Sequence, residues 1–318
     1  MVIDHPHVGE AAEAECLAPF QGDLAQFKLG SIGGSFESYC WHGKQWALPI
    51  DAAAQVQAWM PGRRSNPVEH WSQLAEVAAA GELALPLRAP HALMSLFSLC
   101  GLLAVTLTPS EQDLFPPGAI QAYEILAHLA CVLDSSMFDM DPIAVLEEMA
   151  GSGSRLSVVP LIYGYVSYAK DGFRDQIVRF ADIPVVAEDA PRGSTLGGTG
   201  IAISALRGNV AEAESFARWV ASGSVQANLF ANNGGQPAHR DAWESEHLNE
   251  VTGDFYRSTR RTLDLAWIRP RHRGYMAFQH QASVRLEQAL RGGEAGETLI
   301  HDLNALYRST HEAQIQPQ

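Results

Sequence analysis

Residues 193–275 decide the fold, and their most informative part reads Leu196-Gly-Gly-Thr-Gly-Ile-Ala-Ile-Ser204. A short apolar run bounded by glycines predicts a buried strand over residues 200–204. The glycines precede a strand and no lysine follows them, whereas a nucleotide-binding P-loop ends in Gly-Lys-Ser/Thr at the start of a helix. We therefore interpret these glycines as a close approach of the backbone at a hinge or a ligand.

Helices and strands alternate along the rest of the chain. Asn209-Val210-Ala211-Glu212 and Asn66-Pro67-Val68-Glu69 are capping boxes, and Asp141-Pro142 starts a third helix. Residues 118–133 form a fourth amphipathic stretch. Strands are predicted at residues 46–50, 83–87, 156–168 in part, 183–186 and 200–204. This alternation indicates an α/β architecture with largely parallel sheets.

Composition limits the class of protein. A chain of 318 residues suits two lobes of ordinary domain size, and 18% charged residues describe a globular protein. The net charge of −14 argues against a nucleic-acid partner, because phosphate binding needs concentrated lysine and arginine. The longest uncharged run, residues 92–107, is shorter than the roughly 20 residues that a membrane-spanning helix needs, so we expect a buried core helix.

The four cysteines lie far apart in the sequence. Cys16, Cys40, Cys100 and Cys131 contain no C-x-x-C pair, which excludes a zinc ribbon or a redox motif. One disulfide remains open, but buried free thiols are the preferred interpretation.

Enzyme signatures are scarce in the sequence. No Gly-x-Ser-x-Gly elbow and no H-E-x-x-H helix occur. His5 and His7 follow a strand-like start and would point to one side of an extended chain, as in metal-dependent hydrolases of the amidohydrolase type. That fold needs eight βα repeats, which the sequence lacks. A hydrolase using this pair is kept as an alternative, but we expect no enzyme activity, no catalytic residue, no cofactor and no metal.

One basic cluster, Arg269-Pro270-Arg271-His272-Arg273, stands out from the acidic background. A nucleic-acid role would need many more such residues. We expect these arginines to pair with the abundant carboxylates.

Several motifs in order resemble the family 1 extracellular solute-binding proteins of ABC importers, in their sugar-binding branch. The glycine-rich strand of residues 196–204 is followed by Ala213, Phe216 and Trp219 in an "A-x-x-F-x-x-W" helix. Then come Gln226 to Ala231 of a "x-Q-x-x-x-A" helix, the turn at residues 234–240, and Arg269-Pro270 before Tyr275.

The first half of the chain carries further family motifs. Gly43-Lys44-Gln45-Trp46-Ala47-Leu48-Pro49-Ile50 is similar to the "G-K-x-x-x-x-P" strand that crosses between lobes. His70-Trp71-Ser72-Gln73-Leu74 is similar to the "T-W-x-x-L" helix start, with His70 in place of threonine. The resemblance thus covers most of the chain.

The resemblance implies a two-lobed, type II periplasmic-binding-protein-like α/β fold with a hinge and an interlobe cleft. It places residues 1–46 and 190–236 in lobe 1 and residues 47–189 and 237–318 in lobe 2, with crossings near Trp46 and Asp189. The implied function is capture of a small solute, with a sugar or polyol as the expected class, and delivery to an ABC permease. We expect a monomer in the periplasm or at the extracellular surface; a ligand sensor on the same fold is a further alternative.

Ligand-binding candidates were chosen at strand ends and lobe crossings, where α/β folds gather ligands. Sugars are held by aromatic faces and by planar polar side chains that bond hydroxyls. The candidates are His5, His7, Asp51, His91, Tyr163, Tyr165, Thr199 and Gln236. Trp41, Trp219 and Trp267 are expected to be packing residues.

The beginning of the chain carries one more expectation. No signal peptide precedes Met1-Val2-Ile3, which already has the character of a strand interior. Family members begin with a strand and a helix before this point, so the resemblance implies that the first βα unit is missing and that Met1 is not the natural start.

Overall fold

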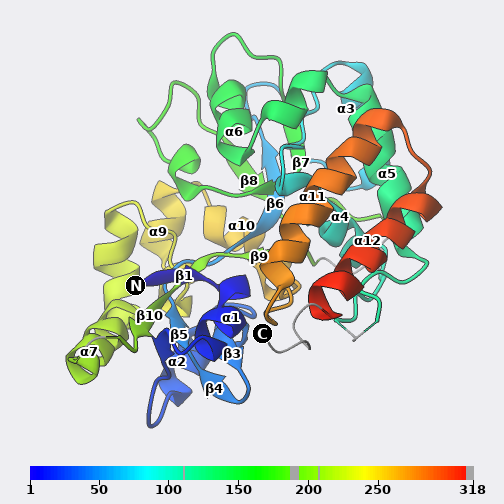
Figure 1. Cartoon of the computed structure of the whole chain (residues 1–318). Helices are drawn as coiled ribbons and strands as arrows, with labels where there is room; N and C mark the ends of the chain where they lie inside the picture. Colours follow the sequence, from blue (N-terminus) through cyan, green and yellow to red (C-terminus); the bar gives the residue numbers. More distant parts are fainter. Residues whose placement is uncertain (110–111, 187–192, 207, 313–318) are drawn as a thin grey trace.

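We describe the protein from a computed structural model, which covers residues 1–109, 112–186, 193–206 and 208–312 (Figure 1). The strands are β1 Val2–Asp4, β2 Leu17–Ala18, β3 Cys40–Trp41, β4 Lys44–Gln45, β5 Ala47–Pro49, β6 Ala53–Trp59, β7 Val158–Tyr163, β8 Arg179–Ala181, β9 Leu196–Gly197 and β10 Thr199–Ser204. The short helices are η1 His5–His7, η2 Glu37–Tyr39, η3 Trp71–Gln73, η4 Ser135–Asp139, η5 Val166–Ala169 and the π-helix η6 Val225–Phe230.

The α-helices are α1 Val8–Glu13, α2 Ala25–Gly30, α3 Leu74–Ala79, α4 His91–Leu102, α5 Ala119–Val132, α6 Pro142–Ala150, α7 Val210–Val220, α8 Arg240–Trp243, α9 Glu246–Val251, α10 Phe255–Asp264, α11 Tyr275–Gly292 and α12 Gly296–Glu312. The predicted helix 118–133 and the core helix within residues 92–107 are confirmed as α5 and α4. The helix at Asp141-Pro142 is confirmed with its cap, because the Asp141 carboxylate accepts from the Ala144 N–H at 2.9 Å.

Two sheets organise two lobes (Figure 1). In the first, the buried strand β10 pairs with β1, β2 and β5; in the second, β6 pairs with β7, β8 and β9. Alternate residues of β10 enter separate cores: Ile201 and Ile203 pack with Leu48 and Phe20, and Ala202 packs with Tyr39. This period of two is what a strand covered on both faces requires.

The second lobe holds the larger core. Helix α4 packs against β6 and β7, while α10 packs against β6 and β8. Helices α5, α11 and α12 add a further helical layer over α4, as Figure 1 shows in green, orange and red. The two lobes of the α/β fold are therefore unequal in size.

The chain passes between the sheets at three neighbouring places. It leaves β5 at Pro49 and enters β6 at Ala53; it also passes from β9 to β10 through Gly198. The third passage lies beside the first, since Asp51 forms a β-bridge with Pro237. The predicted crossing residue Asp189 lies outside the described residues, and the lobe boundaries drawn from the sequence remain predictions.

The prediction of largely parallel sheets was wrong. Every strand ladder among the described residues is antiparallel, and parallel pairing occurs only as isolated bridges. The strands expected at residues 83–87 and 183–186 are two such places, where Leu83 pairs with Val158 and Val185 pairs with His70. The strands β6 and β10 lie at the centres of the two sheets, and all their ladder partners run antiparallel to them.

The helix expected from Asn66 begins later, at Trp71. The Gln57 side chain accepts from the Val68 N–H at 2.7 Å and donates to its carbonyl at 2.8 Å, which holds this segment extended. His70 then becomes the cap, with its N–H bonded to Gln73 Oε1 at 3.0 Å. Helix α7 is confirmed, but the side chain of Asn209 makes no capping bond.

The cysteine prediction holds only in part. All four thiols are free, but only Cys100 is buried and Cys131 is exposed. Trp219 was expected to be a packing residue and is 49% exposed on the outer side of α7.

No helix in the described part of the chain combines the length and apolar character needed to cross a membrane.

A buried polar network fastens α4 to β6 and to the passage before β9. Ser98 Oγ donates to Gln55 Oε1 at 2.6 Å, and the Thr195 N–H donates to Ser98 Oγ at 3.0 Å. Thr195 Oγ1 donates to the Met94 carbonyl at 3.0 Å. Each of these groups would be costly to bury without its partner.

Ser98→Ala should therefore lower the free energy of unfolding by about 2–3 kcal/mol, because it strands the Gln55 oxygen and the Thr195 N–H in the core. Ser35 provides a matched control: its side chain is also buried, but its hydroxyl has no partner. Ser35→Ala should leave stability unchanged or raise it slightly. Melting followed by circular dichroism compares the two, and equal melting temperatures would contradict the role given to the network.

Candidate functional site

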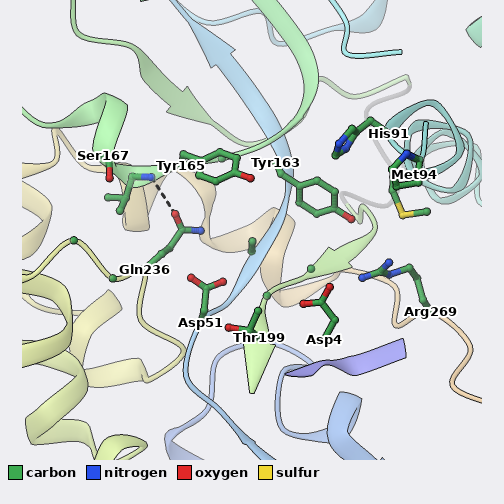
Figure 2. Close-up of a pocket in the computed structure, with 18 of the residues that line it drawn as sticks. Asp4, Asp51, His91, Met94, Tyr163, Tyr165, Ser167, Thr199, Gln236 and Arg269 are labelled. Atoms are coloured by element: carbon green, nitrogen blue, oxygen red, sulfur yellow. Dashed lines mark hydrogen bonds between the residues drawn. The ribbon is translucent and has the colours of Figure 1, made fainter. Parts of the chain in front are cut away.

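A cavity of about 480 Å³ lies where the crossing segments meet (Figure 2). One wall comes from the first sheet and its crossings, and the other from α4 and the segment after β7. The residues that line it include Asp4, Asp51, Ala53, Pro90, His91, Met94, Tyr163, Gly164, Tyr165, Val166, Ser167, Gly197, Gly198, Thr199, Gly234, Gly235, Gln236, Arg269 and Gln279.

The structure brings most of the sequence-predicted site residues to this one cavity. They are Asp51, His91, Tyr163, Tyr165, Thr199 and Gln236. They come from five separate segments of the chain, so their convergence reflects the fold and not their sequence proximity. A ligand role for each of them remains a prediction.

His5 and His7 are not part of the lining. Both lie in the 3₁₀ turn η1, with Pro6 between them, so they do not point to one side as an extended chain would require. His5 is fully buried and neither ring nitrogen has a hydrogen-bond partner, whereas His7 is exposed. Burial, with Arg269 and Arg271 nearby, holds the pKa of His5 well below its usual value, so the ring stays neutral.

The floor of the cavity is built around Thr199, the first residue of β10. Asp4 is its register partner in β1. On the other side, the Asp51 N–H donates to the Thr199 carbonyl at 3.0 Å and the Thr199 N–H donates back at 3.1 Å. One carboxylate from β1 and one from the crossing between β5 and β6 therefore flank one threonine, as Figure 2 shows.

Asp51 has the most perturbed carboxylate of the site. Its side chain is half-buried and accepts no hydrogen bond from the described residues. Burial and then the nearby charge of Asp4 raise its pKa from 3.8 to about 7. Near neutral pH the group is therefore shared between its acid and its carboxylate forms.

The opposite wall carries aromatic and neutral polar groups. Tyr163 ends β7, and Tyr165 follows it after Gly164, whose missing side chain leaves room for Val56 and Phe255. The Tyr163 hydroxyl is buried with no partner, and burial raises its pKa. Burial lowers the pKa of His91 to about 4, so this ring is neutral at physiological pH.

Gln236 holds the wall in place. Its Oε1 accepts from the Val166 N–H at 3.0 Å, as Figure 2 shows. Its Nε2 donates to the Ala52 carbonyl at 3.0 Å. Both ends of the amide are thus engaged by backbone groups. Its main role here is to tie the segment after β7 to the first crossing.

Arg269 closes one side of the cavity and corrects the interpretation of the basic cluster. It is only 9% exposed and donates to Gln279 Oε1 at 3.0 Å, while its Nε has no partner. Among the described residues neither Arg269 nor Arg271 forms an ion pair with a carboxylate; Arg271 donates to the Glu37 carbonyl instead. Arg269 therefore lines the cavity, while Arg271 binds a backbone carbonyl.

Asp4, Met94, Arg269 and Gln279 also line the cavity but were not among the residues predicted from the sequence. Asp4 directly follows the first strand, so the rule that nominated His5 and His7 could have found it. Arg269 belongs to the basic cluster, whose arginines the sequence predicts to pair with carboxylates. Met94 and Gln279 lie inside helices α4 and α11, where nothing in the sequence distinguishes them from other helical residues.

Side chains of the metal-ligating types do not cluster in the described chain, which contains no group of three or more His, Cys, Asp or Glu that could hold a metal ion. What the cavity offers is hydrogen-bonding and charged groups with aromatic faces, arranged across two lobes. This is the arrangement of a binding cleft.

Comparison with known proteins identifies the architecture as the type II periplasmic-binding-protein fold. The MalE sugar-binding protein of Xanthomonas citri superposes with a TM-score of 0.78 at 13% identity, covering 99% of this chain and 84% of its own. A solute-binding protein of Thermotoga lettingae bound with α-D-tagatose gives 0.78 at 16% identity, with 98% and 84% covered.

A third structure extends the range of ligands among these neighbours. A solute-binding protein of Agrobacterium radiobacter, in complex with ribitol, gives a TM-score of 0.77 at 14% identity and covers 97% of this chain and 84% of its own. The structural neighbours are thus maltose-binding and other ABC sugar-binding proteins, which confirms the predicted fold. No protein-family profile and no curated protein matches the sequence.

Proposed function

We propose that the chain is the solute-binding component of an ABC import system, acting as a monomer in the periplasm or at the cell surface. It captures a small carbohydrate or polyol between its lobes by hinge closure and delivers it to a membrane permease. No bond of the solute is made or broken. Binding is a shift of population from open to closed forms.

The observation that carries the proposal is the cavity at the three crossings. Its floor and roof belong to different sheets, so a ligand that touches both favours closure. Tyr163 and Arg269 each have a buried hydrogen-bonding atom that no described residue satisfies, and the Asp51 carboxylate lines the same cavity. Hydroxyl groups, which both donate and accept, suit such a mixed set.

The fold neighbours support the ligand class. Structures bound with α-D-tagatose and ribitol show that this fold accommodates a monosaccharide and a polyol of small size. The volume of the cavity lies within the range of small-molecule sites.

A thermal-shift screen against monosaccharides, oligosaccharides, polyols and amino acids tests the proposal, because a ligand that binds only the folded state raises the melting temperature. We expect a sugar or polyol to raise it by several degrees at about a hundred times its Kd. Turnover of the ligand, or the absence of any shift with sugars and polyols, would contradict the proposal.

Two tyrosine variants locate the binding event. Tyr163→Phe should weaken the identified ligand about three- to tenfold, the effect of one hydrogen bond. Tyr168→Phe is the control, since the Tyr168 hydroxyl donates to Glu147 and lies outside the lining.

Permease-dependent uptake of labelled ligand then separates an importer from a sensor.

A further inference from the structure

The cleft has an excess of acidic groups on its floor. Asp4, from β1, and Asp51, from the crossing after β5, flank Thr199 and line the same cavity. Within the described chain neither carboxylate forms an ion pair or accepts a side-chain hydrogen bond. Asp51 is half-buried, and a charge held there without a partner is costly, so a cation bound beside it would be stabilised more than a neutral group.

The roof above these carboxylates is aromatic. Figure 2 places Tyr163 and Tyr165 across the cavity from Asp51 and Asp4. Tyrosine faces attract cations, most strongly where water is displaced. The buried, unpartnered Tyr163 hydroxyl is an independent sign that this space receives a polar ligand.

Arg269 adds a positively charged hydrogen-bond donor to the same cavity. Its guanidinium lines the same cavity but lies beyond ion-pair distance from both carboxylates, and its partner Gln279 is neutral. Arginine has only donors, so it recognises oxygen atoms of a ligand. The cleft therefore presents acceptors for a cation at one side and donors for hydroxyl or ring oxygens at another.

We propose that the solute carries a primary amine, as in an amino sugar or amino polyol, whose ammonium group lies between Asp4 and Asp51 beneath the two tyrosines. This inference rests on the proposed function and narrows its ligand class. A plain polyol would leave the two acidic groups without a counter-charge. A simple alkyl amine would leave Arg269 without an oxygen.

The test compares each amine with its neutral parent by thermal shift and calorimetry at pH 7. The amines are glucosamine, galactosamine, mannosamine and glucamine. Each is compared with two neutral counterparts: its parent (glucose, galactose, mannose or sorbitol) and its own N-acetylated form. We expect at least one amine to bind about tenfold or more tightly than both of its neutral counterparts, as one added charge interaction predicts.

Each other outcome overturns a specific statement. If a neutral sugar or polyol binds and no amine binds more tightly than its neutral counterparts, the inference is overturned and the proposed function stands. Ethanolamine or putrescine binding as tightly as an amino sugar overturns the carbohydrate class instead. No binding by any member of the panel overturns both.

Asp4→Asn isolates the charge, because Asp4 is exposed and its replacement removes no internal hydrogen bond. The variant should weaken amine binding about tenfold while changing the Kd of the neutral parent less than threefold. Asp171→Asn, at an exposed carboxylate outside the cavity, should change neither. Equal losses for amine and parent in Asp4→Asn would refute the ammonium site.

Discussion

Asp51→Asn is expected to raise the melting temperature at pH 8 by roughly 4–8 °C and to weaken ligand binding at least tenfold. The pKa of Asp51 is about 7 in the folded chain against an ordinary 3.8, with burial as the main cause. Its contribution to stability is complete below about pH 4 and is lost as the pH rises from about 4 to 7, because the unfolded chain then holds the charged form at lower cost.

The amide of asparagine has nearly the same shape and no charge to bury. Three pKa units correspond to about 4 kcal/mol at most, and the partial exposure of the side chain reduces this to about 2–4 kcal/mol. The variant therefore gains stability at pH 8, with about 2 °C for each kcal/mol in a chain of this size. Binding falls because the acceptor for the ligand is weakened, which is the usual conflict between stability and function at a site.

Calorimetric melting at pH 4 and pH 8 checks this prediction. At pH 4 the variant and the natural chain should melt within about 1 °C of each other, since Asp51 is then protonated in the folded state. Asp171→Asn controls for general effects of removing one negative charge from the surface. An unchanged melting temperature at pH 8 would mean that Asp51 is hydrated and not perturbed.

Local patterns predicted most of the framework. The run at residues 200–204 became β10, and Asp141-Pro142 became the start of α6 with its cap in place. These elements depend on apolar periodicity and capping, which lie within a few residues of sequence. The direction of strand pairing could not be obtained in this way, because it depends on which strands become central after the chain crosses between lobes.

Tertiary contacts explain where local signals failed. The capping box at Asn66 is overridden by Gln57, which binds the backbone of Val68 from eleven residues away. Residues 83–87 look like a strand but make only one bridge, because the Leu87 N–H donates to the Met137 carbonyl in η4 instead of joining the ladder. Such contacts have no signature in the segment itself.

The rule of looking at strand ends and crossings led to some residues of the cavity and not to others. Asp51, which follows β5, and Tyr163, which ends β7, both line it. It misjudged His5, since a single 3₁₀ turn after β1 rotates that ring into the interior. It also gave Gln236 a ligand role without foreseeing that two backbone groups engage its amide.

Gly198 is the position where substitution by alanine should be most damaging to the crossing. Its φ is +98°, and an added Cβ would lie 2.3 Å from the Asp51 carbonyl oxygen and 3.0 Å from the Ala52 Cα. The backbone conformation alone costs roughly 1–2 kcal/mol for a residue other than glycine. The clash involves backbone atoms of the neighbouring crossing, so β9, β10 and the Asp51 segment would have to separate.

We expect Gly198→Ala to lower the free energy of unfolding by about 3–5 kcal/mol and to abolish ligand binding at concentrations that saturate the natural chain. Two glycines divide this effect into its parts. Gly43 has φ +72° with no atom within 4 Å of an added Cβ, so Gly43→Ala measures backbone strain alone. Gly153 has no neighbour within 4 Å and no positive φ, so Gly153→Ala should be neutral or slightly stabilising.

Urea and thermal unfolding of the three variants, with calorimetric titration of the ligand, completes the comparison. If Gly198→Ala is no worse than Gly43→Ala and still binds ligand, the contact between the two crossings does not constrain the cleft. We expect instead that the free energy of unfolding of Gly198→Ala lies well below that of Gly43→Ala. That result would show that the close approach of β10 to the Asp51 carbonyl sets the positions of Thr199 and Asp51. The glycine-rich run that identified the fold would then be the same feature that shapes the floor of its binding site.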